Sequence, residues 1–262
     1  MTRRHVTFAC EGSTLVGTVD GGAAATGLLL VTGGNELRSG AWAGQAQFAA
    51  RLAAEGFPVF RFDRRGVGDS EGPNGGFTTS APDIAAALAT FRAECPQLTR
   101  VVGLGNCDAA SALMLAKGAG LDALVLSNPW TIESDDAAPP PGAVRDHYKR
   151  RLSHPRQLLR LLKGEVSIGK LVASLRDALK PAPPPTGLAQ DMKHGIAGFA
   201  GPIRFLTADR DRTAGAFLAA WDKTDPRIRR CPGASHSYVE PEAREWLVQE
   251  VLGVLQETSS PT

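Results

Sequence analysis

Several features that would assign a chain to a class at once are missing from this sequence. Its 262 residues carry a formal net charge of +2, so charge gives no reason to expect nucleic acid or a membrane as a partner. No apolar run reaches the ~18 residues of a transmembrane helix. The opening Met-Thr-Arg-Arg-His leads into an alternating pattern, and not into the apolar segment of a signal peptide. We therefore expect a cytoplasmic protein without stable membrane insertion.

Paired or clustered cysteines are also missing. The four cysteines show neither a C-x-x-C pair nor a grouping with histidine. This argues against a zinc site and a disulfide framework, and we expect neither a metal nor a cofactor. We interpret Cys10, Cys95 and Cys231 as small buried hydrophobic residues. Cys107 differs because of the turn in which it lies.

What the sequence does contain is an alternation of apolar strands and helices. A hairpin over 6–19 opens the chain, and the later strands are expected over 27–32, 58–63, 100–105, 121–127, 203–208 and 228–231. Helices are expected between or after them, over 45–55, 82–94, 214–222 and 241–255. Strands this rich in Val, Leu, Ile and Phe predict an α/β fold, with a mostly parallel central sheet and helices on both faces.

The turn over 105–109, Gly-Asn-Cys-Asp-Ala, is the most informative motif. It joins the apolar strand before it to a helical stretch after it. A strand, a sharp turn and a helix present a nucleophile in the pattern G-x-S-x-G. Here cysteine replaces serine, and Ala109 replaces the second glycine. Because a helix N-terminus stabilises a thiolate, we predict that Cys107 is the nucleophile.

A histidine and an acid complete such a site, in the chain order nucleophile, acid, histidine. Of five histidines, only His236 lies in the loop between the last strand and the final helix, so we predict it as the base. The acid is expected in the loop after the preceding strand, where position favours Asp211 and leaves Asp209 as the alternative. The other aspartate is expected to pair with Arg210 or Arg212, or to cap the next helix.

Two backbone N–H groups are needed to bind the oxyanion that forms when a carbonyl is attacked. The first is expected from Asp108, the residue after the nucleophile. The second is expected from the turn after the strand over 27–32, where Gly33-Gly34-Asn35 lets the backbone approach closely. Gly34 and Asn35 are both candidates for this second donor.

A glycine-containing loop over 63–70 could be mistaken for a phosphate-binding loop. It lacks the Gly-Lys-Ser/Thr ending of a P-loop. Asp63, Arg65, Gly66, Gly68 and Ser70 instead match the pattern Asp-x-Arg-Gly-x-Gly-x-Ser. We predict a structural loop beside the active site.

Residues 130–199 interrupt the alternation, because two proline runs enclose helical stretches there. The stretch over 145–163 holds seven Lys or Arg residues against one acid. It is either a solvated helix face or a cap that attracts an anionic substrate or an acidic partner. We predict a basic helical lid over 130–199, inserted between two parts of one core, 1–129 and 200–262.

With these motifs, most of the chain resembles the α/β-hydrolases. More narrowly, it resembles the bacterial family of exosortase A system-associated hydrolase 1. The narrower resemblance rests on Gly-x-Cys-Asp-Ala-Ala-Ser-Ala at 105–112 and on Asp-Arg-Thr-Ala at 211–214. It rests as well on two stretches of the predicted lid, Arg-Asp-His-Tyr-Lys-Arg-Arg-Leu-Ser-His-Pro at 145–155 and Leu-Lys-Gly-Glu-Val-Ser at 162–167.

The resemblance implies an α/β-hydrolase fold with a helical lid, a triad of Cys107, Asp211 and His236, and an acyl substrate. In the predicted lid we expect Arg145, Tyr148 and Arg151 to contact the substrate. The sequence departs from the pattern at Thr32-Gly33-Gly34-Asn35, which leaves the second oxyanion donor open.

Together these features predict a hydrolase that cleaves an ester or thioester through an S-acyl intermediate on Cys107. We expect a small-molecule or carrier-linked acyl substrate and no nucleic acid partner. One alternative is an acyltransferase that uses the same intermediate. Another is a non-catalytic scaffold that binds an acidic partner through the basic lid. The sequence leaves the oligomeric state open.

Overall fold

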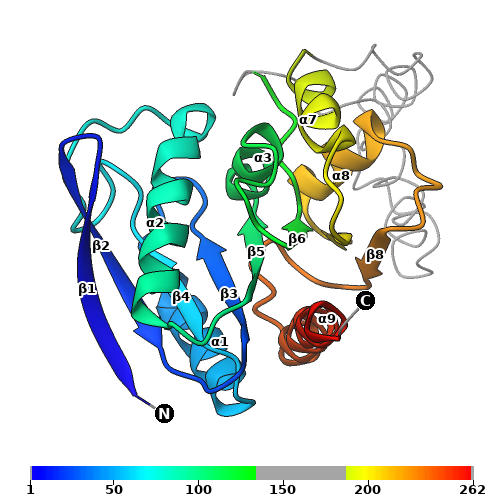
Figure 1. Cartoon of the computed structure of the whole chain (residues 1–262). Helices are drawn as coiled ribbons and strands as arrows, with labels where there is room; N and C mark the ends of the chain where they lie inside the picture. Colours follow the sequence, from blue (N-terminus) through cyan, green and yellow to red (C-terminus); the bar gives the residue numbers. More distant parts are fainter. Residues whose placement is uncertain (1, 134–186, 261–262) are drawn as a thin grey trace, which may run out of the picture.

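The computed structural model describes residues 2–133 and 187–260. Within them the chain forms an eight-stranded sheet in the order β1-β2-β4-β3-β5-β6-β7-β8 (Figure 1). Strand β2 pairs antiparallel with β1 and β4, and the remaining pairings are parallel, so the predicted mostly parallel sheet is confirmed. The strands are β1 (Arg3–Cys10), β2 (Ser13–Asp20), β3 (Thr26–Val31), β4 (Val59–Phe62), β5 (Arg100–Asn106), β6 (Ala123–Ser127), β7 (Ile203–Ala208) and β8 (Ile228–Cys231).

Helices cover both faces of this sheet (Figure 1). One face packs against α1 (Gly44–Ala54) and α9 (Pro241–Ser259). The opposite face packs against α2 (Ala81–Glu94), α3 (Asp108–Leu115), α7 (Gly187–Ala197) and α8 (Arg212–Ala220). Two short 3-10 helices, η1 (Ala41–Ala43) and η2 (Phe77–Thr79), lie in the loops.

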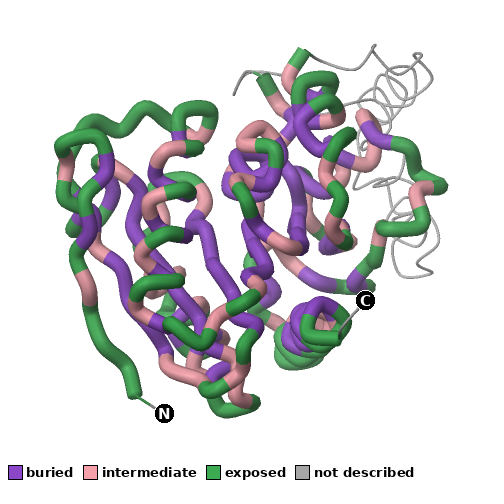
Figure 2. Tube along the Cα trace, in the orientation of Figure 1, coloured by how far each residue is buried: buried purple, intermediate pink, exposed green. Residues whose placement is uncertain are grey.

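The side chains of the central strands alternate between the two helix layers. In β3, Leu28 and Leu30 join the core beneath α1 and α9, whereas Leu29 and Val31 join the core beneath the other four helices. Both sets are buried, because a strand covered on both faces needs apolar residues at every position. Figure 2 shows the result, with burial concentrated in the central strands and exposure along the edge strand β1.

Most predicted elements lie within one or two residues of their observed bounds. Proline lies in the first turn of both α2 and α9, where its missing N–H removes no helical hydrogen bond. Helix α9 continues four residues beyond its predicted end at Leu255. Thr258 lies in this extension, where it is buried and its hydroxyl donates to the Val254 carbonyl at 2.7 Å.

The end of the predicted lid belongs to the core. Helix α7 lies within residues 130–199, yet its Met192 and Ile196 pack in the same apolar cluster as Leu113 and Met114 of α3. Residues 134–186 of the predicted lid lie outside the described residues. No helix in the described part of the chain is both long and apolar enough to cross a bilayer.

Candidate active site

The turn between β5 and α3 holds Cys107 in a backbone conformation that residues with a side chain rarely adopt, with φ 62° and ψ −127°. Such a backbone is strained for a residue other than glycine. Gly105 makes room for the turn, because a Cβ on it would lie 2.6 Å from the carbonyl carbon of Ala109. The observed turn therefore has the geometry of a nucleophile elbow, although Ala109 replaces the second glycine.

Hydrogen bonds fix the Cys107 backbone on both sides. Its N–H donates to the Ser127 carbonyl of β6 at 2.9 Å, and its own carbonyl accepts from the Ala110 N–H of α3 at 3.1 Å. The residue is half-buried and directly precedes α3. It therefore occupies the N-terminal end of α3, where the partial positive charge of the helix dipole lies.

His236 lies between Asp211 and Cys107. Its Nδ1 is 2.9 Å from Oδ2 of Asp211, whose side chain is only 7% exposed. The same carboxylate caps α8 by accepting from the N–H groups of Thr213 and Ala214, each at 3.1 Å. Two backbone donors thus orient Asp211, and Asp211 in turn orients the imidazole.

The surroundings of His236 keep its ring protonated. The hydrogen bond to Asp211, and then that to the Cys107 side chain, raise the pKa of His236 to about 10. Burial opposes these hydrogen bonds because it disfavours a charged ring. At neutral pH the ring is therefore an imidazolium beside the Cys107 sulfur.

Two asparagines, which the sequence reasoning missed, hold the loop of His236 in place. Asn128 is fully buried with φ 43°, and its amide donates to the His236 carbonyl at 3.2 Å and to Asn106 Oδ1 at 3.0 Å. Its oxygen accepts from the Ala208 N–H at 2.8 Å. The sequence held one signal for Asn128, namely an asparagine directly after the apolar strand β6. Such a residue can end a strand in a turn, because asparagine tolerates the left-handed backbone conformation.

The remaining cysteines are buried, as predicted. Burial, with a hydrogen bond to Asp83, raises the pKa of Cys10 to about 11. Burial also raises the pKa of Cys95 and of Cys231. Each of these three thiols is therefore poorly ionised at neutral pH.

Asp209 has a partner that the sequence did not suggest. Its carboxylate forms an ion pair with Arg230 of β8 at 2.8 Å. Arg210 reaches Glu240, at 3.4 Å. The capping role proposed for the second aspartate falls to Asp211 itself, which both caps α8 and contacts His236.

The predicted oxyanion donors behave differently from one another. As the first residue of α3, Asp108 has a backbone N–H with no acceptor in its own helix. The Gly34 N–H donates to Oδ1 of Asp108 at 2.6 Å, so it is engaged in this structure. The Asn35 N–H has no acceptor among the described residues, and its side chain accepts from Asn74 at 2.8 Å.

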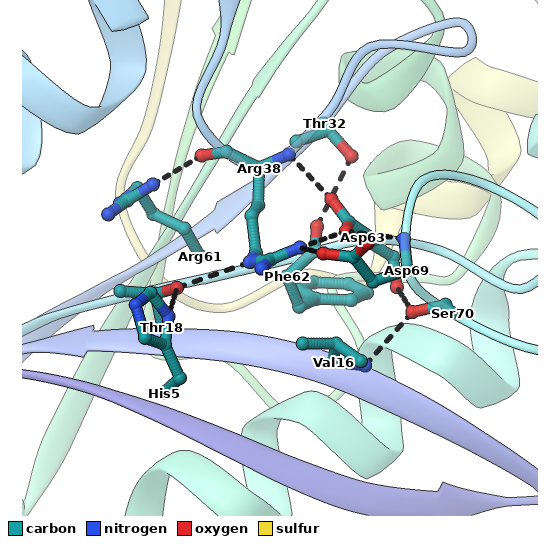
Figure 3. Close-up of polar contacts among 10 residues, drawn as sticks. All are labelled: His5, Val16, Thr18, Thr32, Arg38, Arg61, Phe62, Asp63, Asp69 and Ser70. Atoms are coloured by element: carbon teal, nitrogen blue, oxygen red, sulfur yellow. Dashed lines mark hydrogen bonds and ion pairs between the residues drawn. The ribbon is translucent and has the colours of Figure 1, made fainter.

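Ion pairs and hydrogen bonds centred on Asp63 join the loop over 63–70 to Arg38, four residues after Gly34 (Figure 3). Asp63, which is fully buried, pairs with the Arg38 guanidinium and accepts from the Arg38 N–H at 2.6 Å. Ser70 donates to the Asp63 carbonyl at 2.7 Å and accepts from the Val16 N–H at 2.9 Å. These contacts give the loop over 63–70 the structural role that was predicted for it.

Arg145, Tyr148 and Arg151 lie outside the described residues. Within the described residues no three His, Cys, Asp or Glu side chains come together as a metal site. The candidate site in the described residues therefore consists of Cys107, His236 and the loops around them.

The strand order, with the elbow after β5 and the histidine loop after β8, defines the architecture of the α/β-hydrolase class. Residues 28–250 match the model of the alpha/beta hydrolase family, and the chain belongs to that family. No curated protein sequence matches the chain.

Solved structures with a similar fold include several hydrolases. The α/β hydrolase GrgF from Penicillium sp. sh18 is 16% identical with TM-score 0.65, and the match covers 99% of each chain. The Pyrococcus furiosus esterase Pf2001 is 17% identical with TM-score 0.61, over 99% of this chain and 92% of that one. A thermophilic esterase from Thermogutta terrifontis is 18% identical with TM-score 0.56, over 98% and 100%.

Proposed function

We propose that this chain is a hydrolase that cleaves a carboxylic ester or thioester through an S-acyl intermediate on Cys107. The observation that carries the proposal is the position of His236, whose Nδ1 lies 2.9 Å from Asp211 and whose pKa is raised by Asp211 and by the Cys107 side chain. We also propose that the chain belongs to the narrower family of exosortase A system-associated hydrolases that its sequence resembles. Two similar folds are esterases, but at 17–18% identity that likeness concerns the fold. The support for ester chemistry therefore comes from the residues.

In the first half-reaction, the Cys107 thiolate attacks the substrate carbonyl carbon, and a C–S bond forms. The carbonyl oxygen becomes an oxyanion, which the Asp108 N–H and a second donor from the Gly34–Asn35 turn stabilise. Collapse of this intermediate breaks the bond to the leaving group. The leaving group takes the proton from Nε2 of His236, since Nδ1 is held by Asp211.

In the second half-reaction, the neutral His236 accepts a proton from water as the water oxygen attacks the S-acyl carbon. The tetrahedral intermediate collapses to a carboxylic acid and the thiolate, and the imidazolium is restored. Asp211 stabilises that imidazolium and keeps its Nδ1 protonated. This cycle needs no group beyond the three side chains, the backbone donors and water.

Iodoacetamide at neutral pH tests the proposal. We expect Cys107 to be alkylated much faster than Cys10, Cys95 and Cys231, and we expect His236→Ala to remove this advantage. A panel of acyl esters and thioesters should then add an acyl mass to Cys107, read by mass spectrometry. Labelling of Cys107 no faster than the three buried thiols, with no acyl adduct, would leave only a binding scaffold.

A further inference from the structure

Arg64 is a buried cation that contacts Asp108, the first residue of α3, and it belongs neither to the elbow motif nor to the proposed triad. It lies directly after Asp63, and its side chain is only 5% exposed. Nη1 donates to Ser80 Oγ at 3.0 Å. Nη2 donates to the Gly34 carbonyl and lies 3.4 Å from Oδ2 of Asp108.

A contribution to the stability of the fold does not explain why an arginine is buried at position 64. Its Nε is buried and has no hydrogen-bond partner among the described residues. A buried guanidinium with an unpaired donor costs free energy, and its contact with Asp108 is long for a charged hydrogen bond. A neutral side chain of similar size would avoid this cost.

The contacts of Arg64 close a ring around one glycine. The Gly34 N–H donates to Oδ1 of Asp108, while the Gly34 carbonyl and Oδ2 of Asp108 both accept from Arg64. Gly34 has φ +57° and no side chain of its own to hold it. Because a trans peptide is planar, fixing the Gly34 carbonyl also fixes the direction of the Asn35 N–H.

We propose that Arg64 is a positioning residue for the oxyanion turn over 33–35. It holds the turn through the Gly34 carbonyl, and it balances the charge of the Asp108 carboxylate, which would otherwise repel an oxyanion formed beside it. The inference rests on the proposed acyl transfer at Cys107.

Two reactions of the same sulfur separate positioning from structure. In alkylation by iodoacetamide, the Cys107 sulfur attacks a saturated carbon and no oxyanion forms. In acylation by p-nitrophenyl acetate, the same sulfur attacks a carbonyl carbon and an oxyanion forms. For Arg64→Lys, which keeps the charge and loses the planar fork, we expect acylation of Cys107 to fall about 10- to 100-fold. Its alkylation rate should stay within about twofold of the native rate.

Arg65→Lys is the matched control. Arg65 is the next residue, and it binds Asp83 and Glu11 without contacting Gly34 or Asp108. We expect this variant to lower the melting temperature while leaving the ratio of acylation to alkylation unchanged. An Arg64→Lys protein in which both reactions fall together, or in which acylation is unchanged, overturns the inference.

Should Arg64→Lys fail to fold, Arg64→Gln supplies the second measurement. The glutamine amide is neutral, so it neither faces Asp108 with a charge nor offers the planar fork that reaches both Ser80 and the Gly34 carbonyl. Acylation should again fall relative to alkylation, and an unchanged ratio refutes the positioning role. Failure of the proposed function is recognised separately, because the native protein would then show no preferential alkylation of Cys107.

Discussion

Replacing Asp211 by asparagine removes one charge and little else. The two N–H groups of Thr213 and Ala214 bind different oxygens of the carboxylate, so the single amide oxygen of asparagine can still accept one of them. In general, asparagine is as good a capping residue as aspartate. The helix and the loop of His236 should therefore keep their places. What changes is the partner of Nδ1, 2.9 Å away, which is no longer a carboxylate.

The effect of Asp211→Asn on the reactivity of Cys107 can be estimated from the protonated fraction of the His236 ring. The pKa of His236 is raised to about 10 from an ordinary 6.5, chiefly by the hydrogen bond to Asp211. At about pH 7.5 the native ring is nearly all imidazolium, whereas a ring with an ordinary pKa is only about one-tenth protonated. We therefore expect alkylation of Cys107 at that pH to slow by up to about tenfold in Asp211→Asn.

Turnover of esters should fall further than alkylation, by roughly 10²- to 10⁴-fold. An asparagine amide can donate to Nδ1 and thereby stabilise the wrong tautomer of neutral imidazole, which cannot activate water at the S-acyl carbon. Stopped-flow measurement of the p-nitrophenolate burst and of the steady-state rate separates the two half-reactions. The second should be the more affected.

Stability supplies a second measurement with a definite sign. Folded His236 keeps its proton to about pH 10, whereas the unfolded chain loses it near 6.5. The ring's contribution is therefore fully present below about pH 6.5 and is lost as pH rises toward 10. The melting temperature of the native protein should exceed that of Asp211→Asn most at the lower end of this window. A gap that widens with pH, or unchanged alkylation and turnover, would refute the reasoning.

Two further substitutions test other parts of the site. Cys107→Ser should fold normally and turn over p-nitrophenyl esters at least about 100-fold more slowly, because an alcohol is not pre-ionised by the imidazolium. Comparable turnover by the serine variant would contradict the thiolate model. Gly105→Ala should lower the melting temperature strongly, since its Cβ would lie 2.6 Å from backbone atoms of Ala109 and Ala110. Thermal unfolding decides, and a stability change below about 1 kcal/mol would show that the elbow relaxes easily.

The fold could be predicted because its strongest determinants are local. Continuous apolar strands such as Leu28–Val31 need cover on both faces, and glycines and prolines mark the ends of the helices between them. The sequence positions of Cys107 and His236 then follow from the topology, since both lie in loops after parallel strands. Their carboxyl ends meet at one edge of the sheet.

The network around these residues could not be predicted, because it is made by contacts distant in sequence. Asn128 reaches the His236 carbonyl across 108 positions, and Arg64 reaches Asp108 across 44. The hydrogen bond from the Gly34 N–H to Asp108 is likewise a contact between residues far apart in sequence. A backbone donor can be located from the sequence, but whether a side chain already binds it depends on how the loops fold together.

The charges around Cys107 limit what can react there. A thiolate at 107 lies with the carboxylates of Asp108 and Asp211, against the imidazolium of His236, the guanidinium of Arg64 and about half a positive charge from the start of α3. Among the described residues this balance is slightly negative, and attack on the carbonyl moves the negative charge of the thiolate onto the oxyanion. An acyl group with its own negative charge beside the carbonyl would add repulsion at the point where the new charge develops. The reacting end of the substrate is therefore expected to be neutral. Comparing matched esters with neutral and with carboxylate-bearing acyl groups should show acylation of Cys107 by the neutral one alone.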